Sequence, residues 1–383
     1  MSGSTRSFEM ARRLVEMGHQ VEIITSTREN DIKNYELRTI ESGIIVNWIK
    51  VNYSNNMLFW PRIISFVKFA FLAFLKAKKL KGDIIFASST PLTISLPGIF
   101  AARLNRIPFY FEVRDLWPEI PIAMGYLKNP ILRYLALKLE KYSYHNSRGI
   151  VALSDGMKDG IINTGYPSEK VTVIPNGADL DSFDFNKDFK SDFRKKFGFE
   201  DNDVIILYPG TFGRVNNLEY LVDLANKFIY QNNIKFMLVG EGNERDLIIN
   251  KAKSLSLFQR NMFFFDKIPK NEISNYFSMS DIVISTVMPL KELEANSANK
   301  FFDALASGTC MVVNHGGWQE HELIKFNCGF RLPRNIDEAF IKLKYYTEDK
   351  MKLKNMGHNA RILAKEKYSR DILAKRLADF FEQ

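Results

Sequence analysis

The sequence predicts an α/β protein of two doubly wound domains, and three observations lead to this fold class. Short apolar runs alternate with helical stretches along most of the chain, which is the pattern of parallel sheets covered by helices. The length of 383 residues exceeds what one ordinary core holds. Hydrophobic residues make up 46% of the chain and charged residues 25%, as in a folded soluble protein.

The first half begins with a helical pattern, EMARRLVEMGH, and continues with short runs rich in Val, Ile and Phe. Such runs predict parallel strands buried on both faces. They lie at 21–25, 43–49, 83–88, 109–113, 149–154 and 171–176. Helical stretches at 93–106 and 129–146 separate some of them. We therefore expect a Rossmann-like domain over residues 1–178.

The second half repeats this alternation. Its predicted strands lie at 204–210, 236–240, 262–266, 281–286 and 311–315. The stretch 176–198 is polar, acidic and then basic, and it has the composition of a linker. We expect a second Rossmann-like domain over 179–368, a helix over 369–383 that returns to the first domain, and ligands beyond the carboxyl ends of the strands.

The small polar residues at the start of the chain form the kind of turn that follows a central strand. Ser2, Gly3, Ser4 and Thr5 precede the first helix directly, yet no strand precedes them. A doubly wound domain starts with such a strand, and small residues after it let the backbone approach a ligand. We therefore expect that the first strand of domain 1 is missing here; the alternative is a fold that begins with a helix.

The net charge of +9 is concentrated in an aromatic segment, Met57 to Gly82. Rings such as Trp60 and Phe69 alternate there with lysines and arginines. A helix of this kind can lie in the interface of an anionic membrane. The alternative is a helix that covers a sheet with solvated lysines. No nucleic-acid-binding motif accompanies the charge, so we expect no nucleic acid partner.

The hydropathy of the sequence predicts no targeting signal. The N-terminus is polar, and no run of about 18 apolar residues predicts a spanning helix. Cys310 and Cys328 lack a Cys-x-x-Cys spacing and are typical of reduced core cysteines. We expect a cytoplasmic protein, peripheral at the inner face of the cytoplasmic membrane.

The segment 291–323 contains the most informative polar residues. Asn296 or Ser297 can cap a helix that runs to about residue 307, and the start of such a helix attracts anions. Lys300 adds a charge in the first turn, and Asp303 offers a carboxylate one turn later that can accept hydrogen bonds from a ribose diol. The alternative is a capped helix with an exposed Lys–Asp pair.

Three glycine turns follow predicted strands in the same half. Gly210 and Gly213 flank Thr211, and Arg214 comes directly after them. Gly240 begins the turn of LVGEGNE. Backbone and guanidinium groups at such turns can meet phosphate oxygens.

These motifs resemble retaining glycosyltransferases of the GT-B fold, family 4. The resemblance covers nearly the whole second half through IPNGAD, LVGEG, SDIVIST and FFDALASG. In the first half, EVRDLWPE is similar to the bacterial fucosamine transferases of surface-polysaccharide pathways. The implied fold has two Rossmann-like domains that face a central cleft. The implied activity is transfer of a sugar from a UDP-sugar to a polyprenyl-diphosphate-linked or other glycan acceptor.

The resemblance assigns roles to individual residues. The ribose-binding carboxylate of the family falls on Asp303, and its donor-sugar Glu falls on Ala295, which moves that contact to Glu292 or Glu294. The phosphate-binding Arg and Lys of the family align with Thr211 and Asn216, which are uncharged. These departures favour a deoxy or N-acetylated sugar as the donor.

Two nearby residues can supply the positive charges that Thr211 and Asn216 lack. Arg214 and Lys300 are our candidates, and Asn299 before Lys300 matches the amino-sugar subgroup. The resemblance also implies that the backbone at Lys267 and Ile268 holds the base. Gly3 and Ser4 are expected to approach the phosphates.

Arg114 and Asp115 stand where the broader family has a His-Asp pair beside the donor sugar. With Lys300 they form our predicted catalytic set; for Asp115, the alternative is a structural carboxylate paired with Arg114. Glu119 is a weaker candidate for binding hydroxyl groups. The five histidines show no metal-ligand spacing, so we expect no metal ion and no cofactor besides the nucleotide-sugar.

Two other functions remain open on the sequence. A UDP-N-acetyl sugar 2-epimerase shares the architecture and needs no acceptor. An inactive, membrane-binding fragment would bind no nucleotide.

Overall fold

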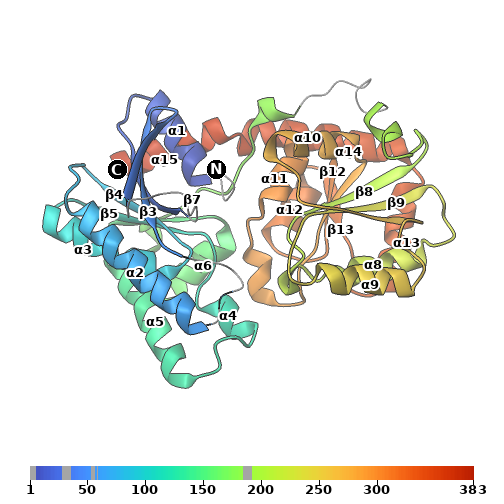
Figure 1. Ribbon diagram of the computed structural model, residues 1–383. Helices are drawn as coiled ribbons and strands as arrows, with labels where there is room; N and C mark the ends of the chain where they lie inside the picture. The colour runs from blue at the N-terminus through green and yellow to red at the C-terminus, as the bar shows by residue number, and fades with distance from the viewer. Residues whose placement is uncertain (1–5, 28–35, 53–56, 58, 184–191) are drawn as a thin grey trace. The chain divides into compact units, whose positions relative to one another are not determined.

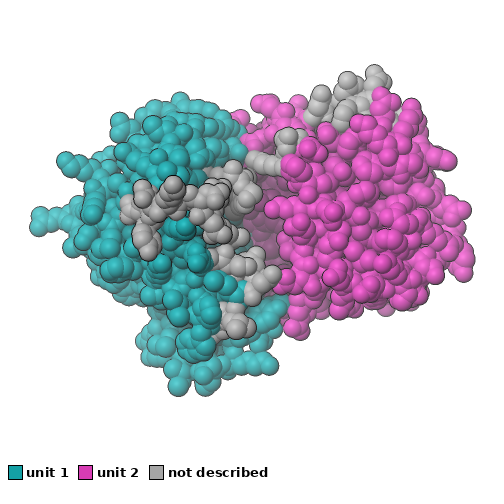
Figure 2. All heavy atoms as spheres, in the orientation of Figure 1, with its two compact units in different colours: residues 1–175, 373–383 teal, residues 176–372 magenta. Residues whose placement is uncertain are grey.

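The computed structural model describes residues 6–27, 36–52, 57, 59–183 and 192–383, and two compact units make up the chain (Figures 1 and 2). Unit 1 comprises residues 1–175 and 373–383, and unit 2 comprises residues 176–372. The boundaries in our predictions lie after residues 178 and 368. The predictions for Gly3 and Ser4 fall outside the described residues.

Unit 1 is an α/β unit whose strands belong to two sheets, ordered β1-β3-β2 and β4-β5-β6-β7. The strands are β1 (Glu22–Thr27), β2 (Glu36–Glu41), β3 (Ile44–Lys50), β4 (Ile85–Ser88), β5 (Phe109–Val113), β6 (Gly149–Ala152) and β7 (Val171–Val173). The helices are α1 (Arg6–Glu16), α2 (Phe59–Ala77), α3 (Ser95–Asn105), α4 (Glu119–Ala123), α5 (Pro130–His145), α6 (Asp155–Asn163) and most of α15 (Arg370–Glu382).

Strand β2 is absent from our prediction because its sequence, ELRTIE, is charged rather than apolar. It pairs with β3 in the antiparallel direction and lies at the sheet edge, where such a sequence is tolerated. The other pairs in unit 1 are parallel, as predicted.

Alternating side chains of β5 show how helices cover both faces of its sheet (Figure 1). Phe111 contacts Tyr144 of α5, with the ring centroids 6.2 Å apart. Tyr110 faces the other way and contacts Phe380 and Phe381 of α15 at 5.3 and 5.2 Å. Every residue of β5 is therefore buried, including the charged Glu112.

Unit 2 contains one parallel sheet with the order β10-β9-β8-β11-β12-β13. Its strands are β8 (Val204–Pro209), β9 (Ile234–Val239), β10 (Met262–Phe265), β11 (Ile282–Ser285), β12 (Cys310–Val313) and β13 (Gly329–Arg331). Its helices are α8 (Leu218–Lys227), α9 (Arg245–Ser254), α10 (Lys270–Met279), α11 (Asn299–Ala306), α12 (Trp318–Lys325), α13 (Ile336–Thr347) and α14 (Lys350–Leu363).

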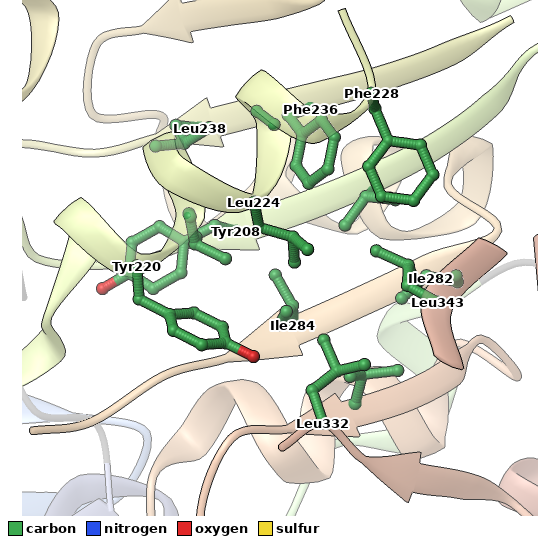
Figure 3. Packing of buried hydrophobic residues seen from close by; sticks show 14 of the residues in the cluster. Tyr208, Tyr220, Leu224, Phe228, Phe236, Leu238, Ile282, Ile284, Leu332 and Leu343 are labelled. Carbon is green, nitrogen blue, oxygen red and sulfur yellow. The ribbon is translucent and has the colours of Figure 1, made fainter. Parts of the chain in front are cut away.

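The core of unit 2 lies on both faces of this sheet. On one face, side chains of the central strands pack against α8 and α13, where Phe228, Phe236 and Leu343 are fully buried (Figure 3). On the other face, residues such as Leu207 and Val283 pack against α11 and α14. The predicted alternation of strands and helices is therefore confirmed, although the three-residue β13 was too short to be predicted.

The interpretation of 176–198 as a linker is wrong at Arg194. This arginine is 3% exposed. Its guanidinium donates to Asp281 Oδ2 at 2.6 Å and to the Met279 carbonyl at 2.8 Å. A buried charge needs such partners, so this part of the segment is anchored to unit 2.

Membrane-spanning helices are not found among the described residues, where no helix combines the length and the hydropathy that crossing a bilayer requires.

We expect Glu140→Gln to stabilise the protein at alkaline pH. Glu140 is 2% exposed and accepts a hydrogen bond from Tyr144 Oη at 3.2 Å. Burial, reinforced by the charge of Glu119, raises the pKa of Glu140 from 4.5 to about 7. The folded state therefore prefers the protonated acid, and its contribution to stability is full below pH 4.5 and lost as the pH rises through 7.

Urea unfolding of Glu140→Gln should show a gain of about 1–3 kcal/mol over the wild type at pH 8, since one pKa unit corresponds to about 1.4 kcal/mol. At pH 4.5 the gain should vanish. Glu366→Gln, at an exposed position, serves as the control. An equal gain at both pH values would contradict this explanation.

Candidate functional site

The carboxyl end of β8 is where the predicted glycine turns come together. Gly210 has φ +156°, and a Cβ built on it would lie 2.7 Å from Lys300 Nζ. A Cβ on Gly240, in the turn after β9, would lie 1.9 Å from the Gly210 carbonyl oxygen. The two turns therefore contact each other through backbone, which only glycine permits at this distance.

Gly240 thus has a packing role that the sequence did not reveal. Its amide donates to the Phe265 carbonyl at 3.1 Å, and the Gly210 amide donates to the Val239 carbonyl at 2.9 Å. These bonds extend the sheet ladder by one residue beyond the strands. They fix the position of the Gly210 turn.

The helix that the sequence places at this edge begins at Asn299 and not at residues 296–297. Its N-cap is Ala298, whose side chain makes no capping hydrogen bond. The prediction of Asn296 or Ser297 as the cap is therefore wrong. Lys300 lies in the first turn of this helix, α11, and Asp303 lies one turn later, as predicted.

Asn296 and Ser297 are instead held by other structural bonds. The Asn296 carbonyl accepts hydrogen bonds from Trp318 Nε1 at 2.9 Å and Gln319 Nε2 at 3.1 Å. Ser297 Oγ accepts from the backbone amide of Asn176 at 3.3 Å. The Asn296 side chain donates through Nδ2 to the Leu293 carbonyl at 2.6 Å, and its Oδ1 accepts from Gln319 Nε2 at 3.4 Å. These side-chain bonds, with that of Ser297, take the place of a cap on α11.

Lys300 is the most unusual charged residue of unit 2. The residue as a whole is half-buried, but its Nζ atom is inaccessible to solvent. No acceptor for Nζ is found in the described part of the chain. The ammonium lies 3.9 Å from the ring centroid of Tyr208, and burial lowers its pKa from 10.5 to about 7. The Tyr208 ring offsets only part of the cost of burying a charge.

The sequence offered one signal for this arrangement. Tyr208 stands two residues before Gly210, so its ring lies next to the gap that the glycine leaves. Tyr208 is buried, and its hydroxyl donates to the Thr211 carbonyl at 2.8 Å. It was missed because a tyrosine in an apolar strand looks like ordinary core.

The other predicted residues of unit 2 lie on the loops and helix at the carboxyl ends of the strands. Thr211 and Arg214 are exposed, and Gly213 is half-buried between them. Asn299 and Asp303 are half-buried on α11. In the loop after β10, Lys267 is exposed and Ile268 is half-buried. Of the predicted residues, the structure brings Lys300 together with Gly210.

A separate polar cavity of about 460 Å³ lies near the ends of β11, β12 and β13. Its lining includes Lys291, Glu294, His315 and Arg334. Glu294 lies 3.8 Å from Arg334, and burial lowers the pKa of His315. Glu294 is thus paired with Arg334 at the wall of this cavity.

In unit 1, Arg114 and Asp115 follow β5 directly. Asp115 is exposed, and Arg114 is half-buried. The dense surroundings of the carboxyl raise the pKa of Asp115 to about 6, while the charge of Arg114 opposes this rise. Because solvent reaches the side chain, screening weakens both effects. A carboxyl that titrates near neutral pH can exchange protons with a substrate.

Sequence reasoning missed a buried ion pair beside them. Arg6 Nε lies 2.8 Å from Glu112 Oε1, and the two side chains are 3% and 2% exposed. The remaining Arg6 nitrogens donate to the carbonyls of Ile174 at 2.9 Å and Pro175 at 2.6 Å. The charges of Arg6 and Arg114 and a hydrogen bond from Ser88 overcome the effect of burial and lower the pKa of Glu112.

Glu112 carried a recognisable signal, since it is the one charged residue in the strand FYFEV. Its partner could not be identified, because Arg6 is 106 residues away in the sequence. Among the described residues, no group of three His, Cys, Asp or Glu side chains could hold a metal ion.

Comparison with known proteins gives two matches that together span most of the chain. A model of "Glycosyltransferase Family 4" matches residues 3–182, and one of "Glycosyl transferases group 1" matches residues 189–363. An uncharacterized glycosyltransferase of Methanocaldococcus jannaschii is 24% identical over 97% of this chain and 92% of its own length.

Two further similarities concern sugar nucleotides. The UDP-Gal:alpha-D-GlcNAc-diphosphoundecaprenol alpha-1,3-galactosyltransferase of Escherichia coli is 28% identical over 74% of this chain and 71% of its own length. The crystal structure of HepE from Anabaena in complex with UDP-glucose superposes with a TM-score of 0.74, at 15% identity, over 100% of this chain and 96% of that one.

Proposed function

The chain belongs to the family 4 glycosyltransferases with the GT-B fold, and from this we propose that it transfers a sugar from a UDP-sugar to a lipid-linked glycan acceptor. The enzyme class itself follows from the family, so the epimerase alternative is not retained. The donor and the acceptor are the proposed parts.

The buried ammonium of Lys300 is the observation that carries the donor proposal. A buried cation without an acceptor is costly, and proteins keep such groups where a ligand supplies the counter-charge. Lys300 lies in the first turn of α11 and beside the side-chain-free backbone of Gly210. A diphosphate at this edge of the sheet would meet the ammonium, the positive helix end and glycine backbone together.

The remaining roles follow from position on the same unit. Asp303, one turn after Lys300, accepts hydrogen bonds from the ribose. Arg214 contributes a second charge to the diphosphate, and the backbone of Lys267 and Ile268 holds the base. Asn299 and Thr211 complete the donor-binding residues. For unit 1 we propose that Arg114 and Asp115 contact the donor sugar.

The chemistry needs no protein nucleophile. The bond from the anomeric carbon to the diphosphate oxygen breaks, and the acceptor hydroxyl forms a bond to the same face of that carbon. The hydroxyl proton passes to the leaving diphosphate. The protein stabilises the charge that develops on this diphosphate, for which Lys300 is the main group. We propose that no metal ion takes part.

The donor sugar itself is the finer part of the proposal. Ala295 replaces the glutamate that the resemblance implies for a hexose donor, and it is buried at 8% exposure. Glu294, next to it, lies against Gly316 and Arg334. An N-acetylated or deoxy sugar fits the loss of that carboxylate, and this supports a fucosamine-type donor in surface-polysaccharide biosynthesis.

The binding of UDP is expected to weaken as the pH rises above 7. An unliganded Lys300 with a pKa of about 7 must take up a proton when a diphosphate binds, because the anion raises its pKa back toward 10.5. Affinity should fall by up to about tenfold per pH unit between pH 7 and 9. Isothermal titration calorimetry in two buffers of different ionisation enthalpy measures this uptake.

GDP, titrated in parallel, tests the choice of base. A Kd for UDP that does not change between pH 7 and 9 would contradict the role of Lys300. No binding of any nucleotide would instead favour the inactive-fragment alternative.

An exposed apolar surface on unit 1 supports a membrane-bound acceptor. Trp60, Ile64, Val67 and Phe71 are 59–69% exposed and form one stripe along α2. Other helices of unit 1 also carry exposed apolar side chains, namely Leu104 on α3 and Ile131, Tyr134 and Leu135 on α5. Exposed Lys68, Lys78 and Lys79 accompany the stripe on α2 and the turn after it. Rings and lysines in this arrangement suit an anionic bilayer surface.

Phe69 is not part of this surface. It is half-buried and packs with Ile49 and Ala73 in the core of unit 1. Val67→Glu is therefore the better test of membrane binding, and we expect it to reduce flotation with phosphatidylglycerol vesicles at least tenfold. Ile341→Glu, on an exposed position of unit 2, should leave flotation unchanged. Equal flotation of both variants, or binding that ignores anionic lipid, would contradict the membrane proposal.

A further inference from the structure

The polar cavity near the ends of β11, β12 and β13 is separate from the donor-binding residues of unit 2. It lies toward the β13 edge of the sheet, and its lining includes neither Lys300 nor Gly210 nor Asp303. Its volume of about 460 Å³ suits a small molecule rather than a single ion. The donor proposal therefore leaves this cavity without a role.

Three cations border the cavity, and their ion pairs leave them available to a ligand. Lys291, Arg331 and Arg334 are all exposed. Arg334 Nη2 lies 3.8 Å from Glu294 Oε1, which is beyond hydrogen-bond distance. Arg331 Nη1 donates to Glu320 Oε2 at 3.1 Å. A guanidinium has five N–H donors, so one such contact leaves donors for a second anion. Three positive charges face two negative ones here, which favours an anionic ligand.

The cavity also has two acceptor groups, which an anion alone would leave unused. The first is the carboxylate of Glu294. The second is His315, which is 1% exposed and has its Nδ1 atom 2.8 Å from the Gly316 carbonyl oxygen. A carbonyl oxygen only accepts, so Nδ1 carries the proton and Nε2 is an acceptor. Burial lowers the pKa of His315, which keeps the ring in this neutral form.

The acceptor nitrogen of His315 is only weakly engaged. Its contact with Asn296 Nδ2 is long, at 3.5 Å, and the same Nδ2 donates to the Leu293 carbonyl at 2.6 Å. A buried acceptor normally has a closer donor. Hydroxyl groups of a ligand can donate both to this nitrogen and to Glu294.

We propose that this cavity is a second sugar-binding site, which holds a sugar with one anionic group, either a carboxylate or a phosphate monoester. The anionic group pairs with Arg331 and Arg334, and the sugar hydroxyls donate to Glu294 and His315. The negative charge of Glu294 repels an anion that brings no hydroxyl donors, so inorganic phosphate fits less well. The site does not depend on the identity of the donor.

Calorimetric titration of the full chain, with UDP present at saturation, tests the site. The probes are glucuronate, glucose 6-phosphate, glucose and inorganic phosphate. At least one of the two anionic sugars should bind at least tenfold more tightly than glucose and than inorganic phosphate. Arg334→Gln should weaken this binding at least tenfold, because it removes one charged donor group. Arg260→Gln, at an exposed position of unit 2, should leave it unchanged.

Glu294→Gln gives a second, opposite effect. It removes the repulsive charge and one hydroxyl acceptor together, so inorganic phosphate should bind more tightly and the preference for the anionic sugar should fall at least threefold. An unchanged preference would remove Glu294 from the site. Inorganic phosphate that binds the wild type as tightly as both anionic sugars would overturn the assignment to a sugar.

Lys300→Met separates this site from the donor site, even if UDP does not bind. The anionic sugar should bind this variant as it binds the wild type. Its loss in Lys300→Met, or its displacement by UDP, would place the anion in the donor site and overturn the proposal. Equal binding of glucose, or no binding of either anionic sugar, would also overturn it. A preference for glucuronate assigns the site to a uronic acid residue of a glycan, and a preference for glucose 6-phosphate assigns it to a free sugar phosphate.

Discussion

Replacing Lys300 by methionine is expected to lower the kcat/KM for UDP release from a UDP-sugar by a factor of about 10²–10³, which corresponds to the loss of one preorganised group that stabilises developing charge. Methionine keeps the length and the apolar stem of the lysine. It therefore removes the ammonium without emptying the space beside Tyr208 and Gly210.

The same substitution should make the unliganded protein more stable. Burial lowers the pKa of Lys300 from 10.5 to about 7, so the unfolded chain binds more protons than the folded one between these values. The unfavourable contribution of Lys300 to stability is therefore full below pH 7 and disappears as the pH rises to 10.5. The gain from Lys300→Met should accordingly be about 1–3 kcal/mol at pH 6.5 and should shrink toward pH 10.

Lys354→Met is the control, because Lys354 is exposed on α14 and should affect neither quantity. Urea unfolding and the rate of UDP release separate the two effects. A stable but inactive Lys300→Met protein would support the donor site. If the variant lost stability and activity together, Lys300 would be a structural residue.

Gly240→Ala is expected to have the largest effect on stability, a loss of about 2–4 kcal/mol. A Cβ at this position would lie 1.9 Å from the carbonyl oxygen of Gly210, and Gly240 has φ +146°. The atom in the way belongs to backbone, so no rotamer change relieves the overlap. The turn that carries Gly210 would have to move away from β9, which should also weaken UDP binding.

Gly213→Ala is the matched control on the neighbouring turn. Its φ is −130°, and the nearest atoms to a Cβ, on Asn216 and Thr211, are 3.7 Å away. Stability should stay within about 1 kcal/mol of the wild type, measured by urea unfolding. Similar losses for both variants would contradict the close approach of the two turns.

The donor-site residues show which features of the site can be predicted from neighbouring residues in the sequence. The glycine turns after β8 and β9 and the position of Lys300 near the start of α11 could be predicted, because all are fixed within a few residues of a strand or helix end. The cap of α11 could not. Asn296 and Ser297 are good capping residues by type, but their side chains bond to Leu293, Gln319 and Asn176 instead.

The sequence by itself determined the fold class, because the spacing of apolar residues predicts each strand and helix from its own residues alone. Only the tertiary structure decided which charges are buried and with which partner. The ammonium of Lys300, on helix α11, is buried beside Tyr208 of strand β8 and Gly210 of the turn after it. Arg6 pairs with Glu112, which is 106 residues away in the sequence. The burial of a charged side chain and the choice of its partner depend on residues that are far apart in the sequence. These residues come together only when the helices and strands pack.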